Sequence, residues 1–80
     1  MKIRSVKPNN RRKVFEVRTS SKSLVLPYAK VRPRPTSDDP IARAFVDKDL
    51  GGEGFTYILA SGKEGTIHIE QVLEYNQDPN

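Results

Sequence analysis

Residues able to carry out acid–base or nucleophilic chemistry are sparse in this sequence of 80 residues. Cysteine is absent, and the single histidine, His68, lies in the alternating segment TIHIE, where a histidine is usually structural or merely exposed. The acidic pairs Asp38–Asp39 and Asp47–Asp49 stand in polar stretches, in which solvated carboxylates are poorly suited to catalysis. No serine lies in a nucleophile-elbow pattern. We therefore expect no catalytic residue and predict that the protein is not an enzyme.

Metal binding has one candidate, the stretch DKDLGGEGFTYI at positions 47–58. It begins like a calcium-binding loop, with Asp47 and Asp49 at the first and third positions. The fifth position is Gly51 and the twelfth is Ile58, where a calcium loop requires further oxygen ligands. Losing these ligands removes much of the charge that strips water from the ion. We predict an acidic turn here and no metal site.

The two loops that contain glycine give no site for a phosphorylated cofactor. Residues 51–54, GGEG, precede a strand-like segment, so no helix N-terminus would face a bound anion. Residues 61–66, SGKEGT, lack the Gly-Lys-Ser/Thr ending of a P-loop. Both are predicted to be turns, and no cofactor is expected.

Lysine and arginine gather in the first half of the chain. Residues 1–34 contain eleven of them against one acid, Glu16, whereas residues 35–80 contain three against nine acids. Halves of opposite charge can attract each other within one molecule, pair between two molecules, or present a basic face to an anionic partner. Ordinary solvated surface charge is the remaining explanation.

We predict that the basic half contacts the phosphate backbone of DNA or RNA. On a hairpin, Lys7, Arg11 and Arg12 would cluster at the tip, where a phosphate backbone can reach them without burying charge. Few aromatic side chains accompany them, and Phe15 alternates in phase with Val17, which favours a place in the core over stacking on bases. Binding should therefore be weak, salt-dependent and poor in sequence preference. The predicted contact residues are Arg4, Lys7, Arg11, Arg12, Lys13, Arg18, Arg32 and Arg34.

The stretch YAKVRPRPTSDDP, residues 28–40, joins the basic half to the acidic half. Its prolines are never three residues apart, so it is not a PxxP ligand. Two of them fix their own φ and restrict the arginines before them, which predicts an extended segment with Arg32 and Arg34 on one side. Residues 36–40 are turn-forming and predict a change of direction into the next strand.

Apolar residues alternate with polar ones through most of the chain, the pattern of half-buried β-strands. The fold class that we predict is mainly β, at the border of α+β: a small antiparallel curled sheet of five or six strands with one short C-terminal helix. The helix follows from Ile69, Val72 and Leu73 at helical spacing, with Asn76 and Pro79 as stop signals. Strands are expected at residues 2–7, 13–18, 23–28, 41–47, 54–60 and 66–70, with a turn at KPNN, residues 7–10.

One domain, residues 1–80, is expected, because a chain of this size has room for a single thin core. Within it we predict a basic N-terminal hairpin, residues 1–34, and an acidic C-terminal hairpin with a helical turn, residues 41–76. Apolar runs are only a few residues long, so neither a signal peptide nor a membrane span is predicted. The absence of cysteine fits a reducing compartment, and we expect a soluble, cytoplasmic protein.

Two stretches carry a resemblance to a known kind of domain: LPYAKVRPRPTSDDP, and FVDKDLGGEGFTYILASGKEGTIHIEQVLEYNQDP. They resemble a small bacterial β-domain of unknown function that, in longer relatives, precedes a helical segment and an Xre-type helix-turn-helix module. The likeness begins at Leu26, and its most specific part runs from EGFTY to HIEQVLEYNQDP. The layout is also loosely similar to short domains of unknown function associated with toxin–antitoxin genes.

The resemblance implies a non-enzymatic regulatory module, part of a bacterial transcription regulator or acting beside one. It supplies no catalytic or ligand-binding residues. The sequence to Asn80 offers no recognition helix, so we expect contact with the nucleic-acid backbone rather than reading of the major groove. Whether the natural chain continues into a helix-turn-helix stays open. The alternative is a protein–protein interaction or homodimerisation domain that uses a sheet edge and needs no nucleic acid. No membrane partner and no small-molecule substrate are predicted.

Overall fold

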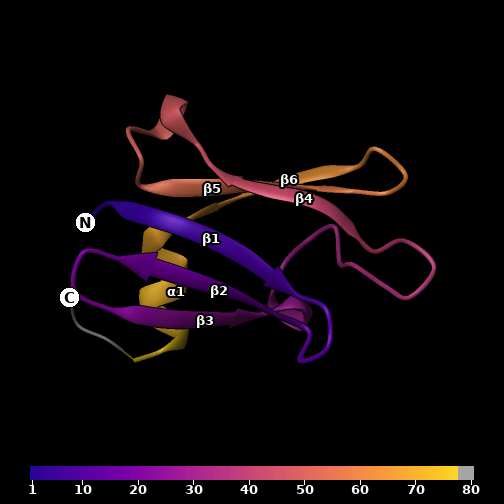
Figure 1. Cartoon of the computed structure of the whole chain (residues 1–80), viewed down its shortest axis with the longest axis horizontal. Coiled ribbons are helices and arrows are strands. Elements are labelled where there is room, and N and C mark those ends of the chain that lie inside the picture. Colours follow the sequence, from indigo (N-terminus) through magenta and orange to yellow (C-terminus); the bar gives the residue numbers. More distant parts are fainter. Residues whose placement is uncertain (78–80) are drawn as a thin grey trace.

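The structure, a computed structural model, describes residues 1–77. Within this part, the chain forms two antiparallel sheets of three strands each and one α-helix (Figure 1). The elements are β1 (Ile3–Asn9), β2 (Val14–Thr19), β3 (Ser23–Pro27), β4 (Ile41–Val46), β5 (Gly54–Leu59), β6 (Glu64–His68) and α1 (Ile69–Tyr75). Two short 3₁₀ turns, Tyr28–Lys30 and Lys48–Leu50, follow β3 and β4.

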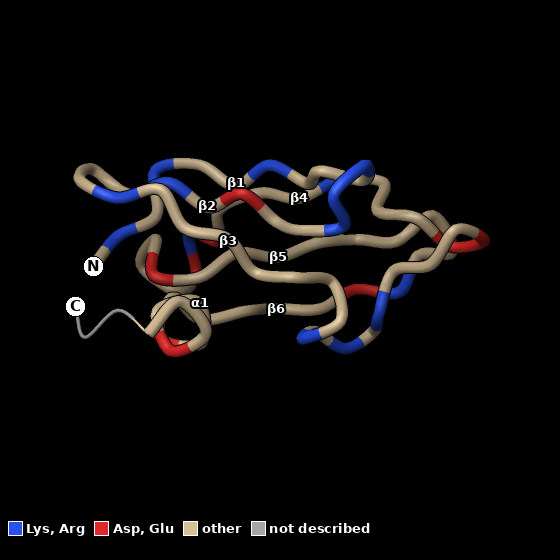
Figure 2. The backbone as a smooth tube through the Cα atoms, turned by 90° about the horizontal axis from the view of Figure 1, so that it is seen from below, with Lys and Arg blue, Asp and Glu red and all other residues tan. Residues whose placement is uncertain are grey.

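The prediction of mainly β structure with a C-terminal helix is confirmed, but the strands form two sheets where one curled sheet was predicted. β1 lies beside β4 in both views (Figures 1 and 2), yet the two strands form no ladder. Each has an irregularity in its pairing, between Ile3 and Ser5 in β1 and between Ile41 and Arg43 in β4. Both irregularities lie in the pairing within each sheet, and Ile3 N donates its hydrogen bond to Gly52 O in the loop before β5, at 2.7 Å, and not to β4.

The first turn comes later than the sequence pattern predicted. β1 continues through Pro8 and Asn9, both of which pair with β2, so KPNN is mostly strand. The proline is tolerated because β1 is an edge strand of its sheet, where a backbone N–H can be absent without loss of a ladder bond. The turn occupies residues 10–13 and is closed by Oδ1 of Asn9, which accepts a hydrogen bond from Arg12 N at 3.0 Å.

The core lies between the two sheets and includes Phe15 at its centre. This side chain is 0% exposed, as the alternation along β2 predicted. Its ring centroid lies 4.9 Å from that of Tyr28, 5.0 Å from that of Phe55 and 5.1 Å from that of Tyr57. Tilted and edge-on aromatic pairs at these separations are favourable. Phe15 therefore connects the β1–β2–β3 sheet to the β4–β5–β6 sheet through direct ring contacts.

Helix α1 packs against β3 and β6, and its inner face buries the three apolar residues whose spacing predicted it. Asn76 ends the helix, as predicted: its Nδ2 donates to Val72 O and to Val25 O, each at 2.7 Å. Its Oδ1 accepts a hydrogen bond from Val25 N at 3.4 Å. The Asn76 amide thus occupies backbone groups on the edge of β3 that another strand would otherwise reach. The second predicted stop signal, Pro79, lies outside the described residues.

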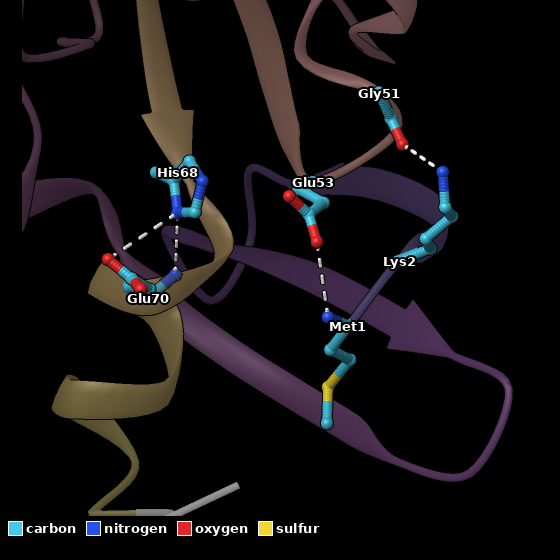
Figure 3. A network of polar contacts seen from close by, with 6 residues as sticks. All are labelled: Met1, Lys2, Gly51, Glu53, His68 and Glu70. Carbon is cyan, nitrogen blue, oxygen red and sulfur yellow. Dashed lines mark hydrogen bonds and ion pairs between the residues drawn. The ribbon is translucent and has the colours of Figure 1, made fainter.

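The N-terminus is tied to the loop before β5 (Figure 3). The Met1 amine lies 3.4 Å from Oε2 of Glu53, and Lys2 Nζ donates a hydrogen bond to Gly51 O at 2.6 Å. Both contacts join a positive group of the basic half to an oxygen of the acidic half. Part of the charge asymmetry is therefore satisfied inside the molecule.

Candidate nucleic-acid interface

All eight basic side chains predicted to contact nucleic acid are exposed, and none of them forms an ion pair with any residue of the described part. Figure 2 shows lysine and arginine along β1, β2 and the turn between them, with more in the segment between β3 and β4. Exposed cations that lack an ion pair leave their charge available to an anionic partner. The eight lie in three places: the strand surface, the hairpin tip and the crossover segment.

The outer surface of β1 and β2 carries positive charge that is partly offset by one acid, Glu16. Lys7 lies opposite Glu16 in the strand register, and Arg18 follows two positions further along β2. Asn9 Nδ2 donates a hydrogen bond to Glu16 Oε2 at 3.0 Å, which holds this carboxylate beside Lys7. Arg4 stands in the irregular part of β1. These bases therefore form a weaker anion-binding surface than their number suggests.

Three bases, Arg11, Arg12 and Lys13, form the hairpin tip, and hydrogen bonds fix its backbone. The Tyr28 hydroxyl donates to Asn10 Oδ1 at 2.8 Å, and Tyr28 N donates to Lys13 O at 2.9 Å. Lys13 has a φ of 59°, in the left-handed region that few residues other than glycine adopt. The tip is thus a shaped cluster of positive charge that a phosphate backbone can approach without burying it.

The two arginines of the crossover segment have different surroundings, although the sequence predicted them to share one side. Arg32 Nη1 donates to Val31 O at 2.9 Å, which turns its guanidinium back onto its own segment. The Arg34 side chain makes no hydrogen bond or ion pair within residues 1–77 and lines a cleft together with Lys13. Residues 31–40 belong to neither sheet. The structure therefore brings Arg34, but not Arg32, to the cleft beside the hairpin tip.

This cleft has a volume of about 680 Å³ and lies where the chain crosses from the first sheet to the second. Its size is within the range of small-molecule sites. Two cations stand at it, no carboxylate lines it, and the rest of its lining is mostly apolar. The residues that matter most for its chemistry are Asn10, Lys13, Pro27, Tyr28, Arg34 and Pro35.

Thr36 and Ser37, which line the cleft, belong to a turn, residues 36–39, that is held by its own hydrogen bonds. Thr36 N and Asp39 N each donate to the carbonyl oxygen of the other residue, both at 3.1 Å. The Asp39 carboxylate accepts from the Ser61 hydroxyl at 2.7 Å and from Ser61 N at 2.8 Å, and these bonds lower the pKa of Asp39 below its ordinary value. Asp39 is therefore directed toward the β5–β6 loop and does not oppose the cations of the cleft.

Two buried tyrosines make the stability of this region dependent on pH. The Tyr28 hydroxyl bonds Asn10, the Tyr57 hydroxyl bonds Pro33 O at 2.8 Å, and burial raises the pKa of each tyrosine from 10.0 to about 12. A pKa that is higher in the folded state means that this stabilisation is complete below pH 10.0 and is lost as the pH rises toward about 12. We expect the midpoint of urea denaturation to fall over that interval.

A pair of variants isolates the contribution of the two buried tyrosines. Tyr28→Phe combined with Tyr57→Phe should remove most of the loss of stability above pH 10.0. Tyr75→Phe is the matched control, because Tyr75 is 43% exposed and its substitution should leave the loss unchanged. An equal dependence on pH in all three proteins would contradict the role of the buried hydroxyls.

His68, the one candidate for acid–base chemistry, caps the start of α1. Its Nδ1 accepts a hydrogen bond from Glu70 N at 3.2 Å (Figure 3). Since a nitrogen that accepts this bond carries no proton, the 3.9 Å contact between Nδ1 and the Glu70 carboxylate is not an ion pair in that state. Histidine is an uncommon N-cap residue. Its position two residues before Glu70, whose backbone N–H has no partner within the helix, was therefore only a weak signal of a helix start in the sequence.

Asp47 has a similar role in the predicted acidic turn. Its Oδ1 accepts from Asp49 N at 2.8 Å, and its Oδ2 accepts from the Thr56 hydroxyl at 2.9 Å. The carboxylate that would open a calcium loop therefore closes a 3₁₀ turn. Within residues 1–77, no group of three or more His, Asp or Glu side chains is arranged to hold a metal ion.

Comparison with protein-family models, curated proteins and solved structures finds no match for the chain. The resemblance to a bacterial domain that precedes an Xre-type module therefore stays a prediction. No helix in residues 1–77 is both long and apolar enough to cross a membrane. The function has to be inferred from the surface and the cleft of this chain.

Proposed function

We propose that the protein is a non-enzymatic, cytoplasmic regulatory module that contacts the phosphate backbone of nucleic acid, as part of a bacterial transcription regulator or beside one. The observation that supports this best is the hairpin tip, where Arg11, Arg12 and Lys13 are exposed on a backbone held by Asn9 and Asn10. Groups that are already held in position lose less conformational freedom on binding. The tip is therefore suited to an extended anion whose charges repeat along a chain.

Helix α1 supports backbone contact over sequence reading. It has seven residues, and its exposed face carries Glu70 and Glu74. A recognition helix presents basic and amide side chains to base edges in the major groove, whereas these carboxylates would be repelled by the phosphates beside the groove. We infer that the protein binds nucleic acid with little discrimination between sequences.

The test of this proposal is a salt titration. Labelled duplex DNA is expected to bind at ~50 mM salt and to be released as salt rises, with a slope of log K against log salt near −4.5 if about five phosphates are contacted. Fluorescence anisotropy of the labelled DNA measures both quantities. Absence of binding at the lowest salt would contradict the proposal.

Association with another protein is the second candidate, and one feature of the second sheet favours it. Within residues 1–77, β6 is an edge strand of this sheet, and near its other edge the side chains of Phe45 on β4 and Leu50 in the 3₁₀ turn after β4 are 37% and 36% exposed. An unpaired strand edge can accept a strand from another chain. Light scattering distinguishes the candidates: self-association gives a mass above the 9.0 kDa of one chain in the absence of nucleic acid. A monomer at high concentration would exclude a homodimer.

A further inference from the structure

We propose that the cleft binds an unstacked nucleotide, so that the nucleic acid is single-stranded at the point of contact. This inference rests on the proposed function and narrows it to one class of nucleic acid. A surface that contacts phosphates alone needs positive charge but has no use for apolar walls. The cleft combines both, because Lys13 and Arg34 stand beside a lining that is mostly apolar.

The charged side of the cleft suits the phosphate of that nucleotide. The side chains of Lys13 and Arg34 form no hydrogen bond or ion pair with the described residues, so both are available to an anion. Asn10 also lines the cleft, and its Oδ1 is occupied by the Tyr28 hydroxyl. Its Nδ2 amino group is then the part left to donate a hydrogen bond to a phosphate oxygen.

The apolar side of the cleft suits a base that has left its stack. Pro27 and Pro40 line it and are not buried, so they offer carbon surface that has neither a backbone N–H nor a polar side-chain group. Bases inside a duplex are covered above and below by their neighbours and cannot enter such a cleft. Bases of a single strand can be splayed out and packed against side chains.

A peptide is a poorer occupant of the same cleft. Peptides in grooves usually bond to the main chain of their host, as an added strand does. Here the prolines of the lining have no backbone N–H, and two neighbouring donors, Tyr28 N and Thr36 N, already bond Lys13 O and Asp39 O. Half of the ten lining residues thus offer a peptide no free backbone N–H, whereas side-chain cations and apolar contact match a nucleotide.

The experiment compares three labelled ligands of equal length, about 12 nucleotides, on the unmodified chain at ~50 mM salt: oligothymidylate, an abasic oligonucleotide and a duplex. If a base enters the cleft, oligothymidylate should bind about tenfold more tightly than the abasic strand, which has the same charge, and more tightly than the duplex. Equal affinities for oligothymidylate and the abasic strand would overturn the inference and leave the proposed function standing. Failure of all three ligands to bind would overturn both.

Filling the cleft tests its role without changing the charge. Ala29 and Ser37 are exposed residues of the lining, and Ala29→Leu with Ser37→Leu places bulk in the cleft but no ring that could stack. This variant should bind the abasic strand as before and lose the tenfold preference for oligothymidylate, whereas Ser21→Leu, in the turn between β2 and β3, should keep it. If the filled variant prefers oligothymidylate over the abasic strand as strongly as the unmodified chain does, the cleft is not the site that binds the base.

Two further measurements test whether an acidic peptide can occupy the cleft and whether the filled variant folds. An oligoglutamate of the same charge should not displace oligothymidylate from the unmodified chain, and equal displacement would overturn the inference in favour of an acidic peptide. Circular dichroism shows whether the filled variant folds. Should it not fold, the comparison between oligothymidylate and the abasic strand on the unmodified chain still decides the question.

Discussion

A chain carrying Arg11→Glu and Arg12→Glu is expected to bind nucleic acid roughly 100-fold more weakly at ~50 mM salt, about tenfold for each phosphate that is no longer bound. Both residues lie at the exposed hairpin tip, and neither forms an ion pair within the described part of the chain, so the unmodified side chains are free to meet phosphates. Reversal replaces two attractive charges with two repulsive ones. The slope of log K against log salt should become less negative by about 1.8.

The matched control for this reversal is Lys48→Glu with Lys63→Glu. Lys48 lies in the 3₁₀ turn after β4 and Lys63 in the loop between β5 and β6, and both are exposed bases outside the predicted contact set. The two double variants have the same net charge. If only overall charge mattered, they would lose affinity equally, and this result would contradict a localised contact at the tip. Thermal melting of both variants checks that the fold survives.

Local patterns in the sequence predicted the elements of this fold, whereas the arrangement of the two sheets depends on contacts that are distant in the chain. Alternation predicted a strand at residues 13–18, which differs from β2 by one residue at each end. The i, i+3, i+4 spacing of apolar residues predicted α1. Nothing in those patterns marks the irregularities at Ile3–Ser5 and Ile41–Arg43, or predicts that β1 and β4 lie side by side without pairing. Bulges arise from how two edges meet, and that meeting is not encoded in either strand alone.

The candidate site, like the fold, was predictable from the sequence only in its local parts. Arg11 and Arg12 were predicted at the hairpin tip together with Lys7, but the later turn leaves Lys7 on β1 and brings Lys13 to the tip instead. The cleft was not predicted, since it exists only where residues 10–13 approach residues 34–40 across the junction of the two sheets. In the sequence, Arg34 is one of several bases in a proline-containing segment. Its place opposite Lys13 becomes visible only when both sheets are assembled.

Phe15→Ala should remove most of the free energy of unfolding, because the aromatic cluster connects the two sheets. Removing a fully buried phenylalanine costs about 3–5 kcal/mol, and a small domain of this kind has a free energy of unfolding of about 5 kcal/mol. The ring lies within 5.1 Å, between centroids, of Tyr28, Phe55 and Tyr57, so its loss leaves a cavity bordered by both sheets. Urea denaturation followed by circular dichroism measures the change.

Phe45→Ala is the matched control, since it removes the same atoms from a side chain that is 37% exposed. The Arg43 guanidinium lies 5.0 Å from the centroid of this ring, and an exposed cation–π contact is worth about 0.5–1 kcal/mol. The variant should stay folded. A loss for Phe15→Ala no larger than for Phe45→Ala would show that the sheets do not pack through Phe15.

The packing of Phe15 also supports Tyr28, which holds Asn10 and borders the cleft. Phe15→Leu, which keeps most of the volume, is therefore expected to weaken selection of oligothymidylate over the abasic strand before it unfolds the chain.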